Sequence, residues 1–203
     1  TAHAAGNPWD GKSALDAVEL MNDGWNIKRE HLPTTQRSHY VITGGGNQPN
    51  IVPDKASVWY YFRDTQLTAV KAMYDAGNRI AAGAAMMTET SVTRRVLGHA
   101  ATNYGNKLIA EAAFANMKAV GLPQWSAADQ NFARAVLSGF GREDKPLASD
   151  GPKLWSPENP NSDRNGGSDD IGDIMWTVPT ITIVYPSNVP GISYHNIMAA
   201  TAM

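Results

Sequence analysis

The feature of this sequence that most restricts its fold is the order of its helix-like and strand-like hydrophobic patterns. Apolar residues recur at helical spacing from Lys12 to about Glu30, and strand-like runs follow at His39 to Thr43 and Ser57 to Arg63. A second helical pattern covers Thr65 to Ala82, and Met87 to Leu97 again has strand character. With one strand ahead of it, this order is a split βαββαβ unit, which predicts an antiparallel sheet with two helices on one face.

Side-chain alternation and capping chemistry add detail to this first unit. Alternation along the second strand places the side chains on two faces, with Val58, Tyr60 and Phe62 on one and Trp59, Tyr61 and Arg63 on the other. A run of turn residues precedes the first helix, and Asp10 in that run is the expected N-cap.

The pattern changes after Gly98, and we place a domain boundary there, between residues 1–98 and 99–203. Two further helices are predicted, at Asn106 to Val120 and at Ser126 to Leu137, with Ser126 as N-cap and the acidic Asp129 three residues on.

The stretch from 141 to 170 is rich in Pro, Gly, Asn, Asp and Ser, which predicts a long loop. Loops of that length in compact domains are usually functional. Thr180 to Val184 then has the composition of a buried strand, and the apolar residues from Ile197 resemble the start of a helix.

Composition excludes several classes of protein. Of the 203 residues, 42% are hydrophobic, which is enough to bury a core, while a net charge of −2 gives no attraction to nucleic acid or to an anionic membrane. The chain has no apolar run long enough to span a bilayer. It has no cysteine, so His and carboxylate side chains must hold any metal, and a cytoplasmic location fits.

Gly6 to Ser13 satisfies the phosphate-loop pattern letter for letter. That mechanism needs a buried strand before the loop and backbone N–H groups that curl around a phosphate. Only five residues precede the pattern, and Pro8 removes one N–H donor. Nucleotide binding at this segment is therefore the weakest of the alternatives.

Three residues of the first unit have side chains suited to a polar substrate. His3 is flanked by small residues and is either an ordinary surface histidine or one that a substrate can approach. Asn50 closes a Gly-rich loop, which is either a hairpin connection or a means of presenting the amide to a ligand. Arg63 ends a strand beside aromatic neighbours, where it is either a cation–π partner or a fork for a carboxylate.

The second unit offers an acidic loop and one histidine. Gly166 to Asp173 is the most acidic short stretch, and its spacing misses the calcium-loop pattern. His195 follows the expected buried strand, a position at which open α/β sheets build their sites.

Taken together, these segments resemble a known family. His3-Ala-Ala, Gly11 to Ala17, Gly45-Gly46 with Pro49 to Asp54, and a strand ending in Arg63 are similar to the lid, or dimerisation, domain of the aminoacylase and aminobenzoyl-glutamate hydrolase family. The loop from Gly167 to Asp173, with Trp176, Val178 and Pro179, resembles the branch of that family formed by the B subunits of aminobenzoyl-glutamate hydrolases. The resemblance covers nearly the whole chain.

The resemblance implies a fold. Residues 1–98 would form a ferredoxin-like βαββαβ lid of α+β type, and residues 99–203 would form the C-terminal part of an α/β zinc-peptidase-like catalytic domain. Complete active sites of the family hold two divalent metal ions, zinc or manganese.

The resemblance also implies roles and partners. The substrate would be a small N-acyl amino acid such as p-aminobenzoyl-glutamate, and the lid would form a homodimer in which His3 reaches the site of the other protomer and stabilises the oxyanion. The substrate-holding residues would be Asn50, Arg63 and Ser168, and His195 would be a metal ligand.

The family's remaining metal ligands and its general-base Glu have no match in these 203 residues, so we expect this chain alone to be inactive. A non-catalytic ferredoxin-like interaction domain is the main alternative to a hydrolase fragment.

Overall fold

The computed structural model describes residues 1–148, 151, 154, 169–184, 186, 188–192, 195 and 197–201. The chain divides into two compact units, Thr1–Thr102 and Asn103–Met203. No helix in the described part of the chain is long and apolar enough to cross a membrane.

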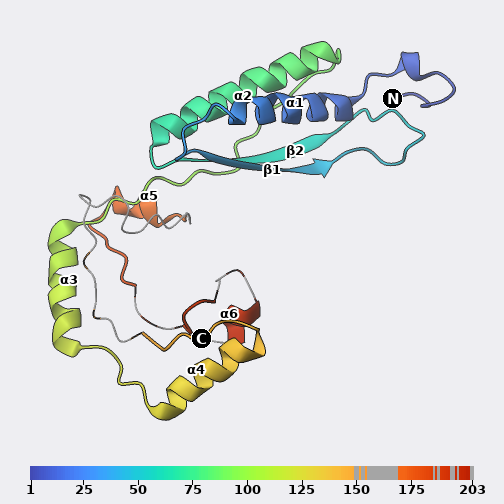
Figure 1. Ribbon diagram of the computed structural model, residues 1–203. Helices are drawn as coiled ribbons and strands as arrows, with labels where there is room; N and C mark the ends of the chain where they lie inside the picture. The colour runs from blue at the N-terminus through green and yellow to red at the C-terminus, as the bar shows by residue number, and fades with distance from the viewer. Residues whose placement is uncertain are drawn as a thin grey trace. The chain divides into compact units, whose positions relative to one another are not determined.

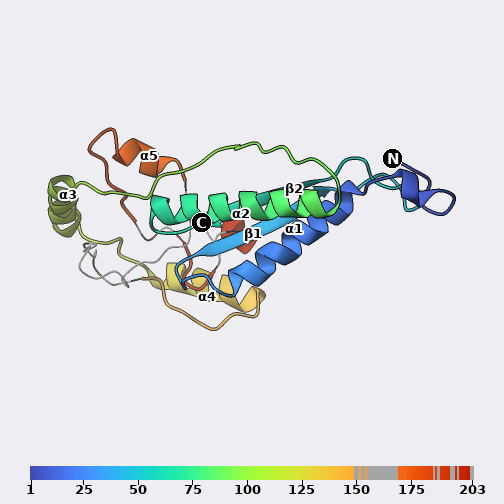
Figure 2. The ribbon, with the colours of Figure 1, turned by 90° about the horizontal axis from the view of Figure 1, so that it is seen from above.

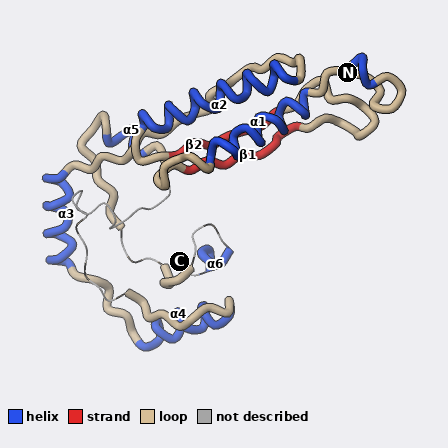
Figure 3. The backbone as a smooth tube through the Cα atoms, turned by 45° about the horizontal axis from the view of Figure 1, so that its top comes forward, coloured by secondary structure: helices blue, strands red, loops and turns tan. Residues whose placement is uncertain are grey.

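The first unit consists of two helices on one side of a β-hairpin. A 3-10 turn, η1 (Pro8–Asp10), precedes helix α1 (Ala14–Arg29), and strands β1 (Arg37–Gly44) and β2 (Ser57–Arg63) lead into helix α2 (Leu67–Met87). Both helices lie on the same side of the hairpin, as Figures 1 and 3 show. Figure 2, which is seen from above, shows α1 and α2 side by side.

The hairpin is antiparallel, and within the described residues its sheet has two strands. Arg37 pairs with Arg63, Tyr40 with Tyr60, and Ile42 with Val58. The predicted alternation is confirmed, because Trp59, Tyr61 and Arg63 are exposed while Val58, Tyr60 and Phe62 are partly buried. This unit is of α+β type, and a complete four-stranded ferredoxin-like sheet stays a prediction.

Trp25 of α1 is the centre of the first core. Its side chain is fully buried, its ring meets that of Phe62 edge-on at 4.8 Å between centroids, and its Nε1 donates a 2.8 Å hydrogen bond to Ser38 Oγ. The two helices approach closely at Gly24, where a Cβ would come within 2.8 Å of Ile80 Cγ2. The core therefore joins both helices to the inner face of the hairpin.

The second unit contains helices α3 (Lys107–Val120), α4 (Ala127–Gly139), α5 (Ile171–Met175) and α6 (Ile197–Thr201). The predicted N-cap of α4 is confirmed as a capping box, because Ser126 Oγ accepts from the Asp129 amide and the Asp129 carboxylate accepts from the Ser126 amide. A core cluster joins α4 to α6; its buried members are Ala133, Leu137, Val189, Ile192, Met198 and Ala199.

Three sequence-based expectations were wrong. Ser13, not Asp10, caps α1, since its Oγ accepts the Asp16 amide at 3.2 Å. The run from 88 to 97 is not in a strand, and α2 instead continues to Met87 because Ala and Met favour helix. Residues 180–184 are described and are in no strand either.

Candidate functional site

The amino-terminal segment forms a small site with the loop that joins β1 to β2. The Val52 amide donates to the Ala2 carbonyl, and the Ala4 amide donates to the Asn50 carbonyl, each over 2.9 Å. His3 and Ile51 thereby form an isolated antiparallel bridge. The structure thus brings together two predicted site residues, His3 and Asn50, which lie 47 positions apart in the sequence.

The imidazole of His3 is held by the turn that follows it. Its Nδ1 accepts backbone N–H groups from Ala5 at 3.2 Å and from Gly6 at 3.0 Å. A ring nitrogen that accepts hydrogen bonds carries no proton, so the neutral ring carries its proton on Nε2. The residue is exposed, so the Nε2 side of the ring is accessible from solvent.

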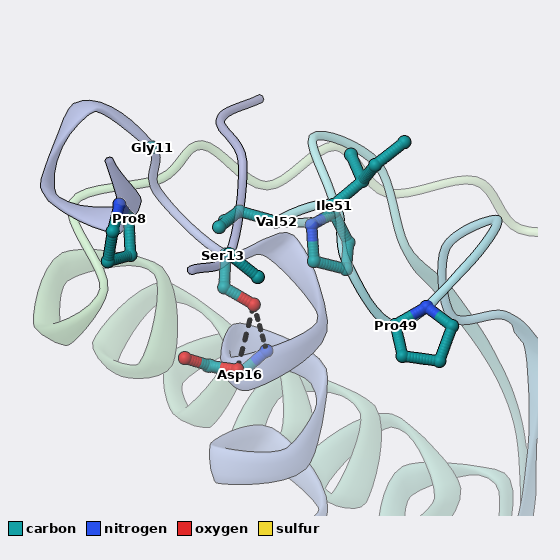
Figure 4. Close-up of a pocket in the computed structure, with 9 residues that line it drawn as sticks. Pro8, Gly11, Ser13, Asp16, Pro49, Ile51 and Val52 are labelled. Carbon is teal, nitrogen blue, oxygen red and sulfur yellow. Dashed lines mark hydrogen bonds between the residues drawn. The ribbon is translucent and has the colours of Figure 1, made fainter. Parts of the chain in front are cut away.

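A shallow depression of about 340 Å3 lies next to the His3 bridge, between the turn at Pro8 and the β1–β2 loop. Figure 4 shows it with the side chains around it, which are mostly small or apolar. Its carboxylate comes from Asp16, whose Oδ1 accepts a 2.7 Å hydrogen bond from Ser13 Oγ. The lining residues are Ala4, Pro8, Gly11, Ser13, Asp16, Pro49, Ile51, Val52 and Pro53.

The same segment lacks the features of a phosphate loop. The Ser13 hydroxyl is engaged in capping α1, and Lys12 Nζ forms a 2.7 Å ion pair with Glu89 Oε2. The hydrogen bond and the charge of Lys12 lower the pKa of the Glu89 carboxyl. What precedes the segment is the His3 bridge instead of a buried strand, so the nucleotide-binding alternative has no structural support.

Arg63 lies at the opposite end of β2 from this site. The strand has seven residues, so its two ends are about 20 Å apart at the usual rise per residue. The guanidinium of Arg63 stacks over Tyr61, with Cζ 5.4 Å from the ring centroid. Within one chain, the structure does not bring Arg63 to His3 and Asn50.

The two predicted site residues of the second unit are placed differently. His195 is exposed and lies in a turn two residues before α6. Ser168 lies outside the described residues. Among the residues that the structure does describe, no group of three or more His, Asp or Glu side chains could hold a metal ion.

Sequence reasoning missed the pairing of residues 2–4 with residues 50–52. Both segments are too short to show strand alternation, and the contact is made by backbone groups. The one sequence signal was Gly11, which lies against Ala2 and Val52 where an added Cβ would be tightly packed.

With this geometry in view, the chain belongs to the aminoacylase-type family of amidohydrolases and peptidases, as its relatives show. It is 31% identical, over 96% of its length, to the B subunit of the p-aminobenzoyl-glutamate hydrolase of Escherichia coli (strain K12), of which it spans 45%. It is also 31% identical to the Xaa-Arg dipeptidase of Mus musculus over 60% of its own length and 28% of that protein.

A third relative is the Xaa-Arg dipeptidase of Homo sapiens, 35% identical over 36% of this chain and 16% of that protein. The chain thus spans less than half the length of each of these relatives. No family model matches the chain.

Proposed function

We propose that this chain forms part of an amidohydrolase that cleaves the amide bond of an N-acyl amino acid such as p-aminobenzoyl-glutamate. Two findings support the proposal. The chain is related over 96% of its length to a hydrolase named for that substrate. It also places an exposed histidine, whose Nδ1 accepts two backbone N–H groups, beside Asn50.

The pair of backbone N–H groups directed at His3 Nδ1 is the observation that carries the proposal. When a nucleophile attacks an amide, negative charge develops on the carbonyl oxygen, and a donor already aimed at that oxygen stabilises the transition state. The N–H groups of Ala5 and Gly6 hold the ring, so the Nε2–H group is oriented before the substrate arrives. Asn50, which directly precedes the bridge residue Ile51, supplies a side-chain amide that can hold the substrate backbone.

Arg63 has a separate role in this proposal. A planar guanidinium forms two parallel hydrogen bonds with a carboxylate, which suits the acid group of an amino acid product or substrate. Ser168 would also line the pocket, and residues 1–98 and 99–203 would be the lid and part of the catalytic domain.

A homodimer through the lid explains how separated residues can serve one reaction. Because β2 separates Arg63 from the His3 site by about 20 Å, one substrate cannot contact both within a single chain. In a closed two-fold dimer, His3 and Asn50 of one chain can meet Arg63 of the other.

A divalent metal centre is a narrower part of the proposal. His195 is suited to be one ligand, since its imidazole is exposed. The described residues do not supply the other ligands as a cluster, so they do not by themselves fit a metal ion. The roles proposed here for His3, Asn50 and Arg63 therefore involve no metal.

The alternative is a non-catalytic interaction domain, favoured by the α+β topology of the first unit. The test is hydrolysis of p-aminobenzoyl-glutamate by the full-length protein and its His3→Ala variant, with His31→Ala, also an exposed histidine of the first unit, as matched control. We expect His3→Ala to lower kcat about 100- to 1,000-fold with little change in KM, as loss of an oxyanion donor does.

His31→Ala should retain wild-type kcat. Equal kcat values in the two variants would contradict the proposed role of His3 as an oxyanion donor. A wild-type protein that dimerises but hydrolyses no N-acyl amino acid would leave the interaction domain as the function to pursue.

A further inference from the structure

Helix α2 ends in a Schellman motif whose left-handed position is occupied by a glutamate. The Thr90 amide donates to the Ala85 carbonyl over 2.9 Å, and the Glu89 amide donates to the Met86 carbonyl over 3.3 Å. These two hydrogen bonds define this type of helix end, which usually has glycine at the position of Glu89. The φ of Glu89 is 52°, and among the described residues other than glycine it is the one with a positive φ.

Two local effects disfavour a glutamate at this position. In the left-handed conformation the Cβ of an L-residue is crowded by its own backbone, which glycine avoids. The carboxylate also lies at the C-terminal end of α2, where the free carbonyl groups carry partial negative charge. The last turn of α2, all of it within the described residues, has no basic side chain to offset that charge. The compensating charge therefore comes from another segment.

That charge belongs to Lys12, which precedes α1. Lys12 Nζ lies 2.7 Å from Glu89 Oε2, so the ion pair joins two segments that are far apart in the sequence. The two side chains are 52% and 72% exposed, and an exposed ion pair contributes little to global stability. Global stability therefore does not account for a glutamate that is both strained and unfavourably placed at the helix end.

Lys12 lies in the segment that supports the candidate site, which we define as residues 11–14 and call the site segment. At its start, Gly11 packs closely against Val52 of the β1–β2 loop. At its end, the Ala14 amide donates to the Pro53 carbonyl of the same loop over 2.8 Å. An ion pair at Lys12 therefore limits the movement of the segment on which this loop packs.

We propose that Glu89 is a positioning residue, whose ion pair with Lys12 joins the site segment to the end of α2 and thereby holds His3 in place. The inference rests on the proposed amidohydrolase function, in which His3 stabilises the oxyanion. Glu89 touches no substrate in this role and acts through Lys12 alone. Glycine at position 89 would then give a better helix end and a less well held site.

Hydrogen–deuterium exchange on the full-length Glu89→Gly variant separates positioning from stability. Removing the strained side chain should slow exchange of the Thr90 amide, which closes the helix end, about fivefold. Losing the ion pair should at the same time speed exchange of the Ala4 and Val52 amides about threefold, because these amides form the hydrogen bonds beside His3. A residue that only stabilised the fold would shift all three amides in the same direction.

Activity should follow the amides of the site. Glu89→Gln keeps the shape of the side chain but removes its charge, and it should lower kcat for p-aminobenzoyl-glutamate about threefold with little change in KM. Lys12→Gln should have the same effect, whereas Lys12→Arg keeps the charge and should retain most of the wild-type kcat. The double variant Lys12→Glu with Glu89→Lys restores an ion pair and should recover part of the loss.

Asp75→Asn is the matched control, since it removes the carboxylate of another exposed ion pair of α2, in which Lys71 Nζ lies 2.9 Å from Asp75 Oδ2. It should leave kcat and exchange at Ala4 and Val52 unchanged. An equal effect of Asp75→Asn on these amides would overturn the proposal, because any charge lost from α2 would then suffice.

The exchange measurement needs no substrate, so it distinguishes this inference from the proposed function. Faster exchange at Ala4 and Val52 in Glu89→Gln supports the ion pair as a positioning device even in a protein that hydrolyses no p-aminobenzoyl-glutamate, in which case the proposed function alone fails. Wild-type exchange at both amides in Glu89→Gln and Lys12→Gln overturns the inference. Slower exchange at all three amides in Glu89→Gly also overturns it, since Glu89 would then only weaken the end of α2.

Discussion

Gly11 lies where the amino-terminal segment packs against the β1–β2 loop, and its replacement by alanine tests whether that close packing positions His3. A Cβ at Gly11 would lie 3.0 Å from Ala2 Cβ and 3.1 Å from Val52 Cγ1. Its φ of −116° is accessible to alanine, so the effect is one of packing, not of backbone strain. Overpacking of this kind costs about 1–2 kcal/mol.

To accommodate the added methyl group, Ala2 and Val52 must move apart, and these two residues flank the His3 bridge. Ala2 and Val52 are joined by the 2.9 Å hydrogen bond next to the His3 bridge. A local penalty of about 1–2 kcal/mol corresponds to a factor of about 5 to 30 in the opening equilibrium. We therefore expect amide exchange at Ala4 and Val52 of Gly11→Ala to speed up by that factor, measured by hydrogen–deuterium exchange on the full-length protein.

Activity should follow, because small misplacements of a catalytic group have large effects on rate. We expect kcat for p-aminobenzoyl-glutamate to fall about tenfold. The matched control is Gly83→Ala, an exposed position of α2 where an added Cβ meets nothing within 4 Å. That variant should leave exchange at Ala4 and Val52 and kcat unchanged, and should stabilise α2 by about 0.5–1 kcal/mol.

A compensating substitution in the Gly11→Ala variant provides a stricter test. Ala2→Gly removes the nearer of the two methyl groups while leaving the carbonyl that accepts from Val52. The double variant should recover part of the lost protection. Wild-type exchange and kcat in Gly11→Ala would refute the idea that this close approach places His3.

Two further predictions concern the core and the proposed dimer. Burial raises the pKa of Tyr60. The buried neutral phenol therefore contributes its full stabilisation below the ordinary tyrosine pKa of 10.0, and this contribution declines as the pH rises above that value. Urea titrations from pH 8 to 11 should show that the free energy of unfolding falls more steeply with pH in the wild type than in Tyr60→Phe. Chains carrying His3→Ala and chains carrying Arg63→Ala, each inactive alone, should regain activity on co-expression if the two residues serve one site from different protomers. Half of randomly assembled dimers are mixed, and each mixed dimer has one intact site of its two. The expected recovery is therefore roughly one quarter of wild-type activity. No recovery in proven mixed dimers would contradict the shared site.

The elements that local chemistry specifies could be predicted from the sequence. The alternation of Val58 to Arg63 is specified by side chains that need opposite environments, and it appears in the structure with the predicted faces. Ser126 caps α4 because its hydroxyl satisfies an amide that has no partner within the helix, an interaction contained in four consecutive residues.

Expectations that needed a distant partner were less secure. The Thr- and Val-rich run after Met87 has strand propensity, yet a strand requires a neighbour that supplies hydrogen bonds along its length. Within the described residues the sheet is limited to β1 and β2, and the alanines before Met87 extend α2 instead. In the second unit, Thr180 to Val184 likewise has the composition of a strand but forms none in the structure.

In the candidate site, too, the residues could be predicted from local sequence, whereas the contact between them could not. His3 and Asn50 could be selected as residues, but their meeting depends on backbone bonds between the amino-terminal segment and residues 50–52, which no side-chain pattern encodes. The fixed His3 tautomer arises from two amides of the following turn, and small residues at Ala5 and Gly6 were the only sequence signal for it.

The first unit separates what keeps it folded from what it presents to ligands. Trp25, Met73 and Ala76 are buried between the helices and the inner face of the hairpin. His3 lies beyond one end of that hairpin, whereas Arg63 lies at the other end and on its outer face. Substitutions at these exposed positions therefore remove functional groups without opening the core, so a loss of activity there can be assigned to chemistry and not to unfolding. The same separation means that the hairpin acts as a spacer of about 20 Å, and a substrate that needs both ends must be enclosed by more than one copy of this unit.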